Sequence, residues 1–167
     1  MIETLPNCIM NNAQAQEKLY RMGLQIQEDA LNGVNIALVG LNKRGFFIAN
    51  ILHNILLKEC SVAVSLVNII IDNSVQNLPT ALQLEVFANK QIIIIDDVAN
   101  TGRSFAYAMH AILPCEPASI KTLALVERSH KLFPIKINYK GLVISTTLQE
   151  HITVKIGDDG NMEAFLN

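Results

Sequence analysis

The amino-acid sequence predicts an α/β fold with a mostly parallel central sheet flanked by helices. Short β-branched runs alternate with longer stretches at helical spacing, which is the pattern of strands joined by crossover helices. Residues 92–95 are four consecutive isoleucines, as expected of a central strand buried on both faces. The chain has 167 residues, 50% of them hydrophobic, which is enough for a sizeable core. Because no linker, repeat or low-complexity segment interrupts it, we expect one domain over residues 1–167.

The first part of the chain is expected to form a helix, a strand, a loop and a second helix. Residues 11–31 carry apolar side chains at helical spacing among polar ones, and Gly33 follows as a stop signal. Residues 34–39 form a short apolar run typical of a strand. A loop over residues 40–45 then precedes an almost continuously apolar helix over residues 46–57. The wide apolar circumference of this helix suits either a deep core or a subunit contact, and the sequence leaves both open.

The rest of the chain is expected to supply further strands and one helix. We expect strands over residues 61–71, 92–95 and 119–126, a helix over residues 105–113, and short closing strands over residues 142–145 and 151–156, with a turn at residues 157–160. The last strands are expected to form a small C-terminal hood over the sheet.

Composition argues against several classes of protein. The net charge is −2 and the pI is about 6.1, so no global basic field attracts nucleic acid or a membrane surface. The three cysteines, Cys8, Cys60 and Cys115, lack the spacing of a disulfide framework or a zinc site, and reduced, buried thiols are expected. No charged segment followed by an apolar run opens the chain, and no apolar stretch is long enough to span a bilayer. We therefore expect a cytoplasmic protein without membrane contact.

The most informative pattern joins a buried strand to two acids and a tight turn. Asp96 and Asp97 follow the isoleucine run, at the edge where open α/β sheets place their ligands. The turn that follows, Thr101-Gly102-Arg103-Ser104, opens a helix whose first backbone N–H groups lack intrahelical partners and suit a phosphate dianion. Because carboxylates do not bind phosphate, the two acids are expected to serve a neighbouring polyol or a metal ion. Two simpler interpretations are an acid pair that caps a helix and a strand end of the response-regulator type, but neither needs the Thr-Gly-x-Ser turn.

This pattern resembles the phosphoribosyl pyrophosphate (PRPP) signature of the type I phosphoribosyltransferases, which is an apolar strand, two acids, three variable residues and Thr-Gly-x-Thr/Ser. The resemblance implies the fold of that family, with PRPP as co-substrate and Mg²⁺ as cofactor. It implies that Asp96 and Asp97 hold the ribose 2′- and 3′-hydroxyls and contact Mg²⁺ directly or through water. It further implies a cradle for the 5′-phosphate made of Thr101, Gly102, Arg103 and Ser104.

A second chemical feature lies in the predicted loop Gly40-Leu41-Asn42-Lys43-Arg44-Gly45. Two cations between glycines, after a strand and before a helix, would present charge and free amides to an anion. Basic loop residues are usually only solvated, so this feature alone is weak evidence. Beside the PRPP signature it resembles the pyrophosphate-binding loop of the same family. The resemblance implies that Lys43 and Arg44 neutralise the departing pyrophosphate, and that Arg44 acts in catalysis with the two acids.

A third stretch, residues 123–141, resembles the bifunctional pyrimidine operon regulator/uracil phosphoribosyltransferase family. By this resemblance Tyr139-Lys140-Gly141 would cover the base, with Arg128 close to its polar edges. A simpler interpretation is that Tyr139 only fills the edge of the core. In the 6-oxopurine branch of the family a base-reading lysine stands at the position of Glu127, and an aspartate at that of the predicted substrate-binding residue Asn100. Because a glutamate cannot donate to a purine carbonyl, a pyrimidine such as uracil is favoured as the base.

Some departures from that branch leave two hypotheses open. Residues 70–73 lack an arginine that the branch carries, and the loop over residues 73–84 is short and has no lysine or arginine. The chain is therefore expected to be either a PRPP-dependent transferase or a weakly catalytic, nucleotide-sensing regulator. RNA binding is disfavoured because the first helix offers only Lys18 and Arg21 as cations. The family resemblance also implies a homodimer or a higher homo-oligomer.

Overall fold

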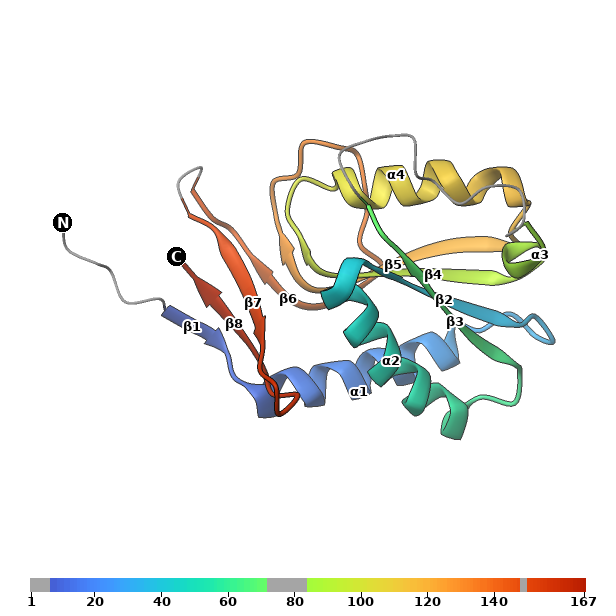
Figure 1. The fold of residues 1–167 in the computed structure, drawn as a ribbon, viewed down its shortest axis with the longest axis horizontal. Coiled ribbons are helices and arrows are strands. Elements are labelled where there is room, and N and C mark those ends of the chain that lie inside the picture. Colours follow the sequence, from blue (N-terminus) through green and yellow to red (C-terminus); the bar gives the residue numbers. More distant parts are fainter. Residues whose placement is uncertain (1–6, 72–83, 148–149) are drawn as a thin grey trace.

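The computed structural model describes residues 7–71, 84–147 and 150–167, and its centre is a five-stranded parallel sheet (Figure 1). All neighbouring strands in it run parallel, as the sequence predicted. The strand order is β3-β2-β4-β5-β6. The strands are β2 (Ile36–Leu41), β3 (Val64–Ile69), β4 (Gln91–Ala99), β5 (Ser119–Arg128) and β6 (Tyr139–Ile144).

Helices cover both faces of this sheet (Figure 1). They are α1 (Asn12–Glu28), α2 (Asn42–Glu59), the short α3 (Leu84–Phe87), and α4 (Arg103–Ile112), which continues into the 3-10 turn η3 (Leu113–Cys115). α1 and α2 lie on one face and α4 on the other. The core accordingly has two parts: Ile93 and Ile95 of β4 face the first pair of helices, whereas Ile92 and Ile94 face α4. The isoleucine run is therefore buried on both faces, as predicted.

The wide apolar surface of α2 is explained largely by its position between the sheet and α1. Ile48 and Leu52 are fully buried in the core on this face of the sheet. On the side facing α1, a Cβ added to Gly23 would lie 2.8 Å from a methyl group of Ile55, so the two helices approach closely there. Leu57 near the end of α2 remains 57% exposed. Of the two alternatives left open by the sequence, packing in the core therefore accounts for most of the apolar residues of this helix.

A small antiparallel sheet pairs residues 7–10 with two C-terminal strands and differs from the predicted hood. It has the order β1-β8-β7, with β1 (Asn7–Met10), β7 (Ile152–Ile156) and β8 (Met162–Leu166). The expected strand over residues 142–145 is not part of it, because β6 pairs in parallel with β5 at the edge of the central sheet. The hood thus consists of two C-terminal strands and one N-terminal strand, rather than C-terminal strands alone. The predicted turn at residues 157–160 joins β7 to β8, with the Gly157 N–H donating to Asn161 O at 2.8 Å.

Several predicted boundaries shift because hydrogen-bonded pairing continues past the apolar runs. β4 extends to Ala99, which pairs with Glu127 of β5, so the acid pair lies within the strand rather than after it. α4 begins at Arg103, two residues earlier than expected. β3 is shorter than predicted and ends at Ile69. The predicted loop over residues 40–45 is not a loop, since β2 ends at Leu41 and α2 begins at the next residue.

The Tyr139 side chain lies in the core beneath α1, whereas the cover over a base expected from residues 139–141 stays a prediction. Its ring is 3% exposed, and its hydroxyl donates to Asp29 Oδ2 at 2.9 Å, just after the end of α1. Lys121 Nζ reaches the same oxygen at 3.1 Å and lies 5.6 Å from the centre of the tyrosine ring. Burial, together with the neighbouring carboxylate, raises the pKa of Tyr139 above its ordinary value. The simpler interpretation, a side chain filling the edge of the core, is the one that the contacts support.

Two further predictions concern the cysteines and membranes. All three cysteines are free, as expected, but only Cys115 is buried; Cys8 is exposed and Cys60 is half-buried, so the prediction of buried thiols was wrong for Cys8. None of the helices in the described part of the chain is long and apolar enough to cross a membrane.

We expect Tyr139→Phe to destabilise the fold without preventing it. The variant keeps the buried ring but leaves Asp29 without one donor, which should lower the free energy of unfolding by about 0.5–1.5 kcal/mol. Urea denaturation followed by circular dichroism measures this difference. Tyr20→Phe is the matched control, because Tyr20 is 51% exposed. Equal losses in the two variants would contradict a stabilising role for the Tyr139 hydroxyl.

Candidate active site

The carboxyl ends of β2 and β4 bring together the acids and one of the cations predicted from the sequence. Because the two strands are parallel neighbours, the residues that follow them lie at the same edge of the sheet. Asp97, near the end of β4, and Arg44, in the first turn of α2, form an ion pair with 3.3 Å between Oδ2 and the guanidinium. The Arg44 side chain is 55% exposed and that of Asp97 13% exposed, so the pair lies at the surface of the sheet edge.

Asp96 and Asp97 have different surroundings although they are adjacent in the sequence. Asp96 is 8% exposed, and its Oδ1 accepts the backbone N–H of Asp97 at 2.9 Å. Burial, and next the charge of Asp97, raise the pKa of Asp96 to about 8. Asp96 therefore holds a proton near neutral pH in this structure, whereas Asp97 has a guanidinium beside it. The two carboxyl groups therefore differ in burial and in their charged neighbours.

Close backbone packing holds the first turn of α2 against the acid pair. A Cβ on Gly45 would lie 2.5 Å from the carbonyl oxygen of Ile95 and 3.4 Å from Asp96 Oδ1, so only glycine leaves room for this approach. No side chain caps this helix, which leaves its first N–H groups available next to the Lys43 and Arg44 side chains. These cations therefore lie at a helix N-terminus, whereas the sequence had suggested a loop. The predicted chemistry, free amides with positive charge, is retained.

Asn42 makes the turn between β2 and α2 possible. Its φ of 54° is in the left-handed region, which asparagine tolerates better than most residues. Its Oδ1 accepts the backbone N–H of Ile71 at 2.9 Å, two residues beyond the end of β3. Asn42 thus ties the cationic turn to the neighbouring strand. Sequence reasoning did not single out this residue, although an asparagine between a strand and a helix is a recognisable signal for a left-handed turn.

The predicted phosphate turn, Thr101-Gly102-Arg103-Ser104, lies at the N-terminus of α4. Gly102 has a φ of 82°, and the Thr101 hydroxyl accepts the N–H of Arg103 at 3.2 Å. The Thr101 carbonyl accepts two further N–H groups, from Leu132 at 3.1 Å and from Phe133 at 3.0 Å. The segment after β5 therefore holds the turn in place. The N-cap residue, Gly102, has no side chain to cap α4, so apart from the Arg103 N–H the first N–H groups of the helix remain available to a ligand.

The end of β5 contains a charged cluster that the sequence did not reveal as a unit. Glu127 is 5% exposed, and each of its two oxygens pairs with the ammonium group of a lysine: Lys131 Nζ at 2.5 Å and Lys140 Nζ at 2.8 Å. Burial works to raise the pKa of Glu127, but the hydrogen bonds from the two lysines hold it below its ordinary value. We name these three residues the lysine–glutamate cluster. The spacing of four residues between Glu127 and Lys131 was a signal for part of it.

Arg128 and Asn100 are also brought together at this edge. One guanidinium nitrogen of Arg128 donates to Asn100 Oδ1 at 2.9 Å, and another donates to the carbonyl oxygen of Thr147 at 2.6 Å. Of the predicted base-binding group, Arg128 and Lys140 thus lie near the other site residues, whereas the Tyr139 side chain does not. Gly141 lies inside β6, where a Cβ would be 2.5 Å from Leu125 O. The predictions about residues 72 and 73 and about the loop over residues 73–84 concern positions outside the described residues, except for Leu84.

The acid pair can supply only part of the coordination sphere of Mg²⁺, and the remaining oxygen atoms would come from a bound substrate or from water. Within the described ranges, no group of three or more histidine, cysteine or acidic side chains gathers around a point that could hold a metal ion. Asp96 and Asp97 nevertheless offer the hard oxygen atoms that Mg²⁺ prefers, and Mg²⁺ commonly takes its remaining ligands from water and from substrate phosphates. The donor set is therefore compatible with Mg²⁺ brought in with a phosphorylated substrate.

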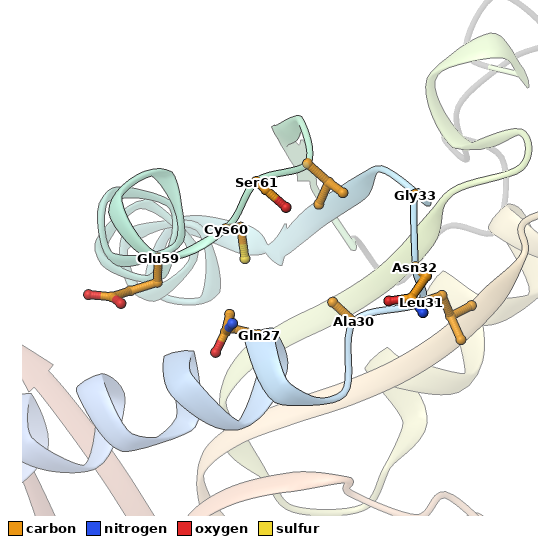
Figure 2. Close-up of a pocket in the computed structure, with 9 residues that line it drawn as sticks. Gln27, Ala30, Leu31, Asn32, Gly33, Glu59, Cys60 and Ser61 are labelled. Atoms are coloured by element: carbon orange, nitrogen blue, oxygen red, sulfur yellow. The ribbon is translucent and has the colours of Figure 1, made fainter.

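A separate pocket lies away from these residues, between the C-terminal ends of α1 and α2 (Figure 2). Its lining includes Gln27, Asn32, Glu59, Cys60 and Ser61. It contains none of the residues predicted to bind a ligand. We therefore place the candidate active site at the carboxyl edge of the sheet and not in this pocket.

Comparison with known proteins shows which family the chain resembles as a whole. The family model described as "Phosphoribosyl transferase domain" matches residues 7–157. A relative named "Bifunctional protein PyrR" from Leuconostoc citreum is 32% identical over 165 residues, which are 93% of this chain and 94% of the relative. A protein of the same name from Listeria monocytogenes is 29% identical over 168 residues, 93% of this chain and 92% of the relative.

Solved structures support the same fold. The hypoxanthine phosphoribosyltransferase of Trypanosoma cruzi superposes with a TM-score of 0.73 at 18% identity, covering 95% of each chain. A hypoxanthine-guanine phosphoribosyltransferase from Bacillus anthracis gives a TM-score of 0.68 at 18% identity, covering 84% of each chain. At this level of identity the likeness concerns the fold alone. It confirms the predicted type I phosphoribosyltransferase-like architecture.

We expect Asp96→Asn to stabilise the protein in the absence of ligand, increasingly so as the pH rises. The unfolded carboxyl titrates near 3.8 and the folded one near 8, so folded Asp96 holds a proton that the unfolded chain has lost. Stability should therefore fall as pH rises between about 4 and about 8, and this dependence should be weaker in the asparagine variant. Thermal unfolding at a series of pH values measures it. A difference in Tm between the two proteins that stays constant over this range would contradict the raised pKa.

We expect substitutions of Asn42 to separate its backbone role from its hydrogen bond. Asn42→Ala loses both the bond to Ile71 and the tolerance for positive φ, which should cost ~2 kcal/mol of unfolding free energy. Asn42→Gly keeps the backbone freedom and should cost less, and Asn42→Asp keeps the acceptor and the turn. Chemical denaturation measures all three variants. Equal stability of the alanine variant and the unsubstituted protein would contradict the role assigned to this turn.

Proposed function

The chain belongs to the phosphoribosyltransferase family, and we propose that it transfers the ribose 5-phosphate of PRPP to a pyrimidine base such as uracil, releasing pyrophosphate. The observation that carries this proposal is the acid pair of β4 lying between the cationic first turn of α2 and the phosphate turn of α4. The choice of a pyrimidine is supported by the resemblance of residues 123–141 to the pyrimidine operon regulator/uracil phosphoribosyltransferase family. The relatives named "Bifunctional protein PyrR" support the same branch.

In this proposal the acid pair binds the ribose. Asp96 and Asp97 accept hydrogen bonds from the 2′- and 3′-hydroxyls, and the turn formed by residues 101–104 binds the 5′-phosphate through its N–H groups and hydroxyls. The two sites adjoin in the sequence, so one short segment positions both ends of the sugar phosphate. Holding the sugar at two points orients C1 for attack by a ring nitrogen of the base.

The α2 turn binds the leaving group in the same proposal. Pyrophosphate gains negative charge as its bond to C1 breaks, and Lys43, Arg44 and the free N–H groups of α2 lie where they would stabilise that charge. Mg²⁺, when bound, would supply further positive charge to the pyrophosphate oxygens. The ribose gains positive charge at the same time, which the Asp97 carboxylate stabilises. Neither effect requires a covalent bond to the protein.

A second candidate function is a nucleotide-responsive regulator with little turnover. The name "Bifunctional" borne by the relatives favours a second function beside catalysis, and the lack of lysine or arginine in residues 73–84 favours low turnover. Pyrophosphate release from PRPP and Mg²⁺, measured with uracil and with each other nucleobase in parallel, distinguishes the two functions. Release with uracil supports the proposed transferase. Release only with a different base supports a transferase that is specific for that base. Binding of PRPP without release by any base supports the regulator.

The proposal includes a homodimer, as the family resemblance implies. Tyr20 of α1 and Leu57 of α2 are large apolar side chains that are 51% and 57% exposed, and they are available to such a contact. Light scattering coupled to size-exclusion chromatography measures the mass in solution. A mass equal to one chain at micromolar concentration would contradict a stable dimer.

We expect Asp97→Asn to reduce kcat/KM for PRPP by ~100-fold or more. The variant removes the carboxylate that pairs with Arg44 and that would stabilise charge on the ribose. Steady-state kinetics with PRPP as the varied substrate measures the effect. Asp158→Asn is the matched control, because Asp158 is exposed in the β7–β8 turn. Unchanged kcat/KM in the Asp97 variant would refute the site assignment.

A further inference from the structure

The lysine–glutamate cluster places two ammonium groups at the carboxyl edge of the sheet. Glu127 and Asp96 are the two acidic side chains in the described part of the chain that are buried, and they lie on neighbouring strands, since Glu127 pairs with Ala99 of β4. Each oxygen of Glu127 already accepts a lysine. Because Glu127 is also only 5% exposed, its remaining lone pairs have little access to a ligand. What the cluster can offer to a ligand is the remaining N–H groups of Lys131 and Lys140.

The cluster carries a net charge of about +1, because two ammonium groups surround one carboxylate. An ammonium group has three N–H donors, and in the described residues each lysine gives one of them to Glu127 and has no other hydrogen-bonded partner. The Lys131 side chain is 12% exposed, so its remaining donors have limited access to water. Donors that are largely withdrawn from water favour a ligand with acceptor atoms.

The backbone fixes the cluster next to the proposed ribose and phosphate sites. Lys131 directly precedes Leu132 and Phe133, whose N–H groups donate to the carbonyl of Thr101 in the phosphate turn. Lys140 pairs with Ala124 of β5, and Ala124 pairs in turn with Asp96. Adjacent strands are about 4.8 Å apart, so the cluster lies one to two strands from the acids that would hold the ribose. In the proposed binding mode the cluster would therefore border the base joined to that ribose.

We propose that Lys131 and Lys140, held in place by Glu127, bind the carbonyl oxygen that stands where an amino base carries its exocyclic amino group (C4–O of uracil, C6–O of hypoxanthine), so that the enzyme selects oxo bases over amino bases. This inference rests on the proposed transferase function and names the substrate class of the same site. A ring carbonyl accepts hydrogen bonds, whereas an exocyclic amino group only donates them and would face donors. The mismatch leaves polar groups unpaired, which strongly disfavours the wrong base. Glu127 is a positioning residue in this scheme, because it acts through the two lysines.

The proposal changes which bases the site excludes. The sequence argument against a 6-oxopurine assumed that Glu127 itself would face the base, and a carboxylate cannot donate to a carbonyl. In the structure the carboxylate is occupied and ammonium groups are presented instead. Uracil and a 6-oxopurine therefore meet the same donors at this cluster. The preference for a pyrimidine must come from contacts elsewhere in the site.

The test compares oxo and amino bases in lysine variants. We would measure kcat/KM for uracil, hypoxanthine, cytosine and adenine in the unsubstituted protein and in Lys131→Met, Lys140→Met and Glu127→Gln. Lys136→Met is the matched control, because Lys136 is exposed in the same segment and its side chain has no ion-pair partner among the described residues. Affinity for PRPP and the thermal unfolding midpoint are recorded for every variant.

We expect each lysine variant to lower kcat/KM for the oxo base at least tenfold, mainly through the KM of the base. Affinity for PRPP should stay within about twofold, and the ratio of oxo to amino activity should fall. Glu127→Gln should lower the same ratio while both lysines are still present, an effect that a merely stabilising ion pair would not produce. If both lysine variants keep the KM for the oxo base and the preference for oxo bases, the proposal is overturned. The proposed transferase function is judged separately, by the loss of kcat/KM in Asp97→Asn.

Two further arms keep the test decisive. Because the Lys140 side chain is 43% exposed, Lys140→Met should fold even where Lys131→Met does not, and it can decide the question alone. If no base is turned over, calorimetric titration with uridine and cytidine 5′-monophosphates replaces kinetics. Tighter binding of the uridine nucleotide, lost in Lys140→Met, would support the cluster as the base-reading element. Equal affinity for both nucleotides in the unsubstituted protein would overturn it while leaving phosphate binding intact.

Discussion

The contact between the first turn of α2 and the end of β4 is the constraint on which the rest of the site depends. Gly45 allows the helix to approach so closely that an added Cβ would lie 2.5 Å from the carbonyl oxygen of Ile95. At the other end of the turn, a Cβ on Gly40 would lie 2.3 Å from the Cα of Phe46. These two glycines fold the chain back directly from strand to helix, and Asn42 supplies the left-handed residue between them. Arg44 lies in a helix that is packed in the core, and this position lets it form the ion pair with Asp97.

The parts of the proposed site that the sequence suggested most directly are contiguous. The acids and the predicted phosphate turn fall within residues 96–104, so a buried strand and the resemblance to the PRPP signature were enough to propose them. The cationic turn was found as well, but its conformation was not, because tight packing against β4 depends on a contact between strands distant in the sequence. For Tyr139, periodicity shows that a side chain is buried but not which face of the sheet it occupies. Its partner Asp29 is 110 residues away in the chain.

The lysine–glutamate cluster shows the same limit more clearly. Lys131 lies four residues after Glu127, and this spacing could have suggested the pair. Lys140 joins them only because β6 pairs in parallel with β5, whereas the sequence had suggested that the last strands form a separate hood. Without that pairing, Glu127 had appeared to be a carboxylate without charged partners. Correct strand pairing turns that residue into a support for two donors.

Charge is arranged across the sheet edge in an order that suits the proposed reaction. Cations of the α2 turn lie on one side of the acid pair, and the lysine–glutamate cluster lies on the other side, beyond β4. In the proposed transfer, positive charge grows on the ribose next to the acids, and negative charge grows on the pyrophosphate next to the α2 turn. The attacking base must also lose a proton from its ring nitrogen, which water or the departing pyrophosphate can accept, and this loss moves negative charge toward its carbonyl oxygens. Ammonium groups beside those oxygens would stabilise that charge, so the same two lysines that select an oxo base would also favour its attack.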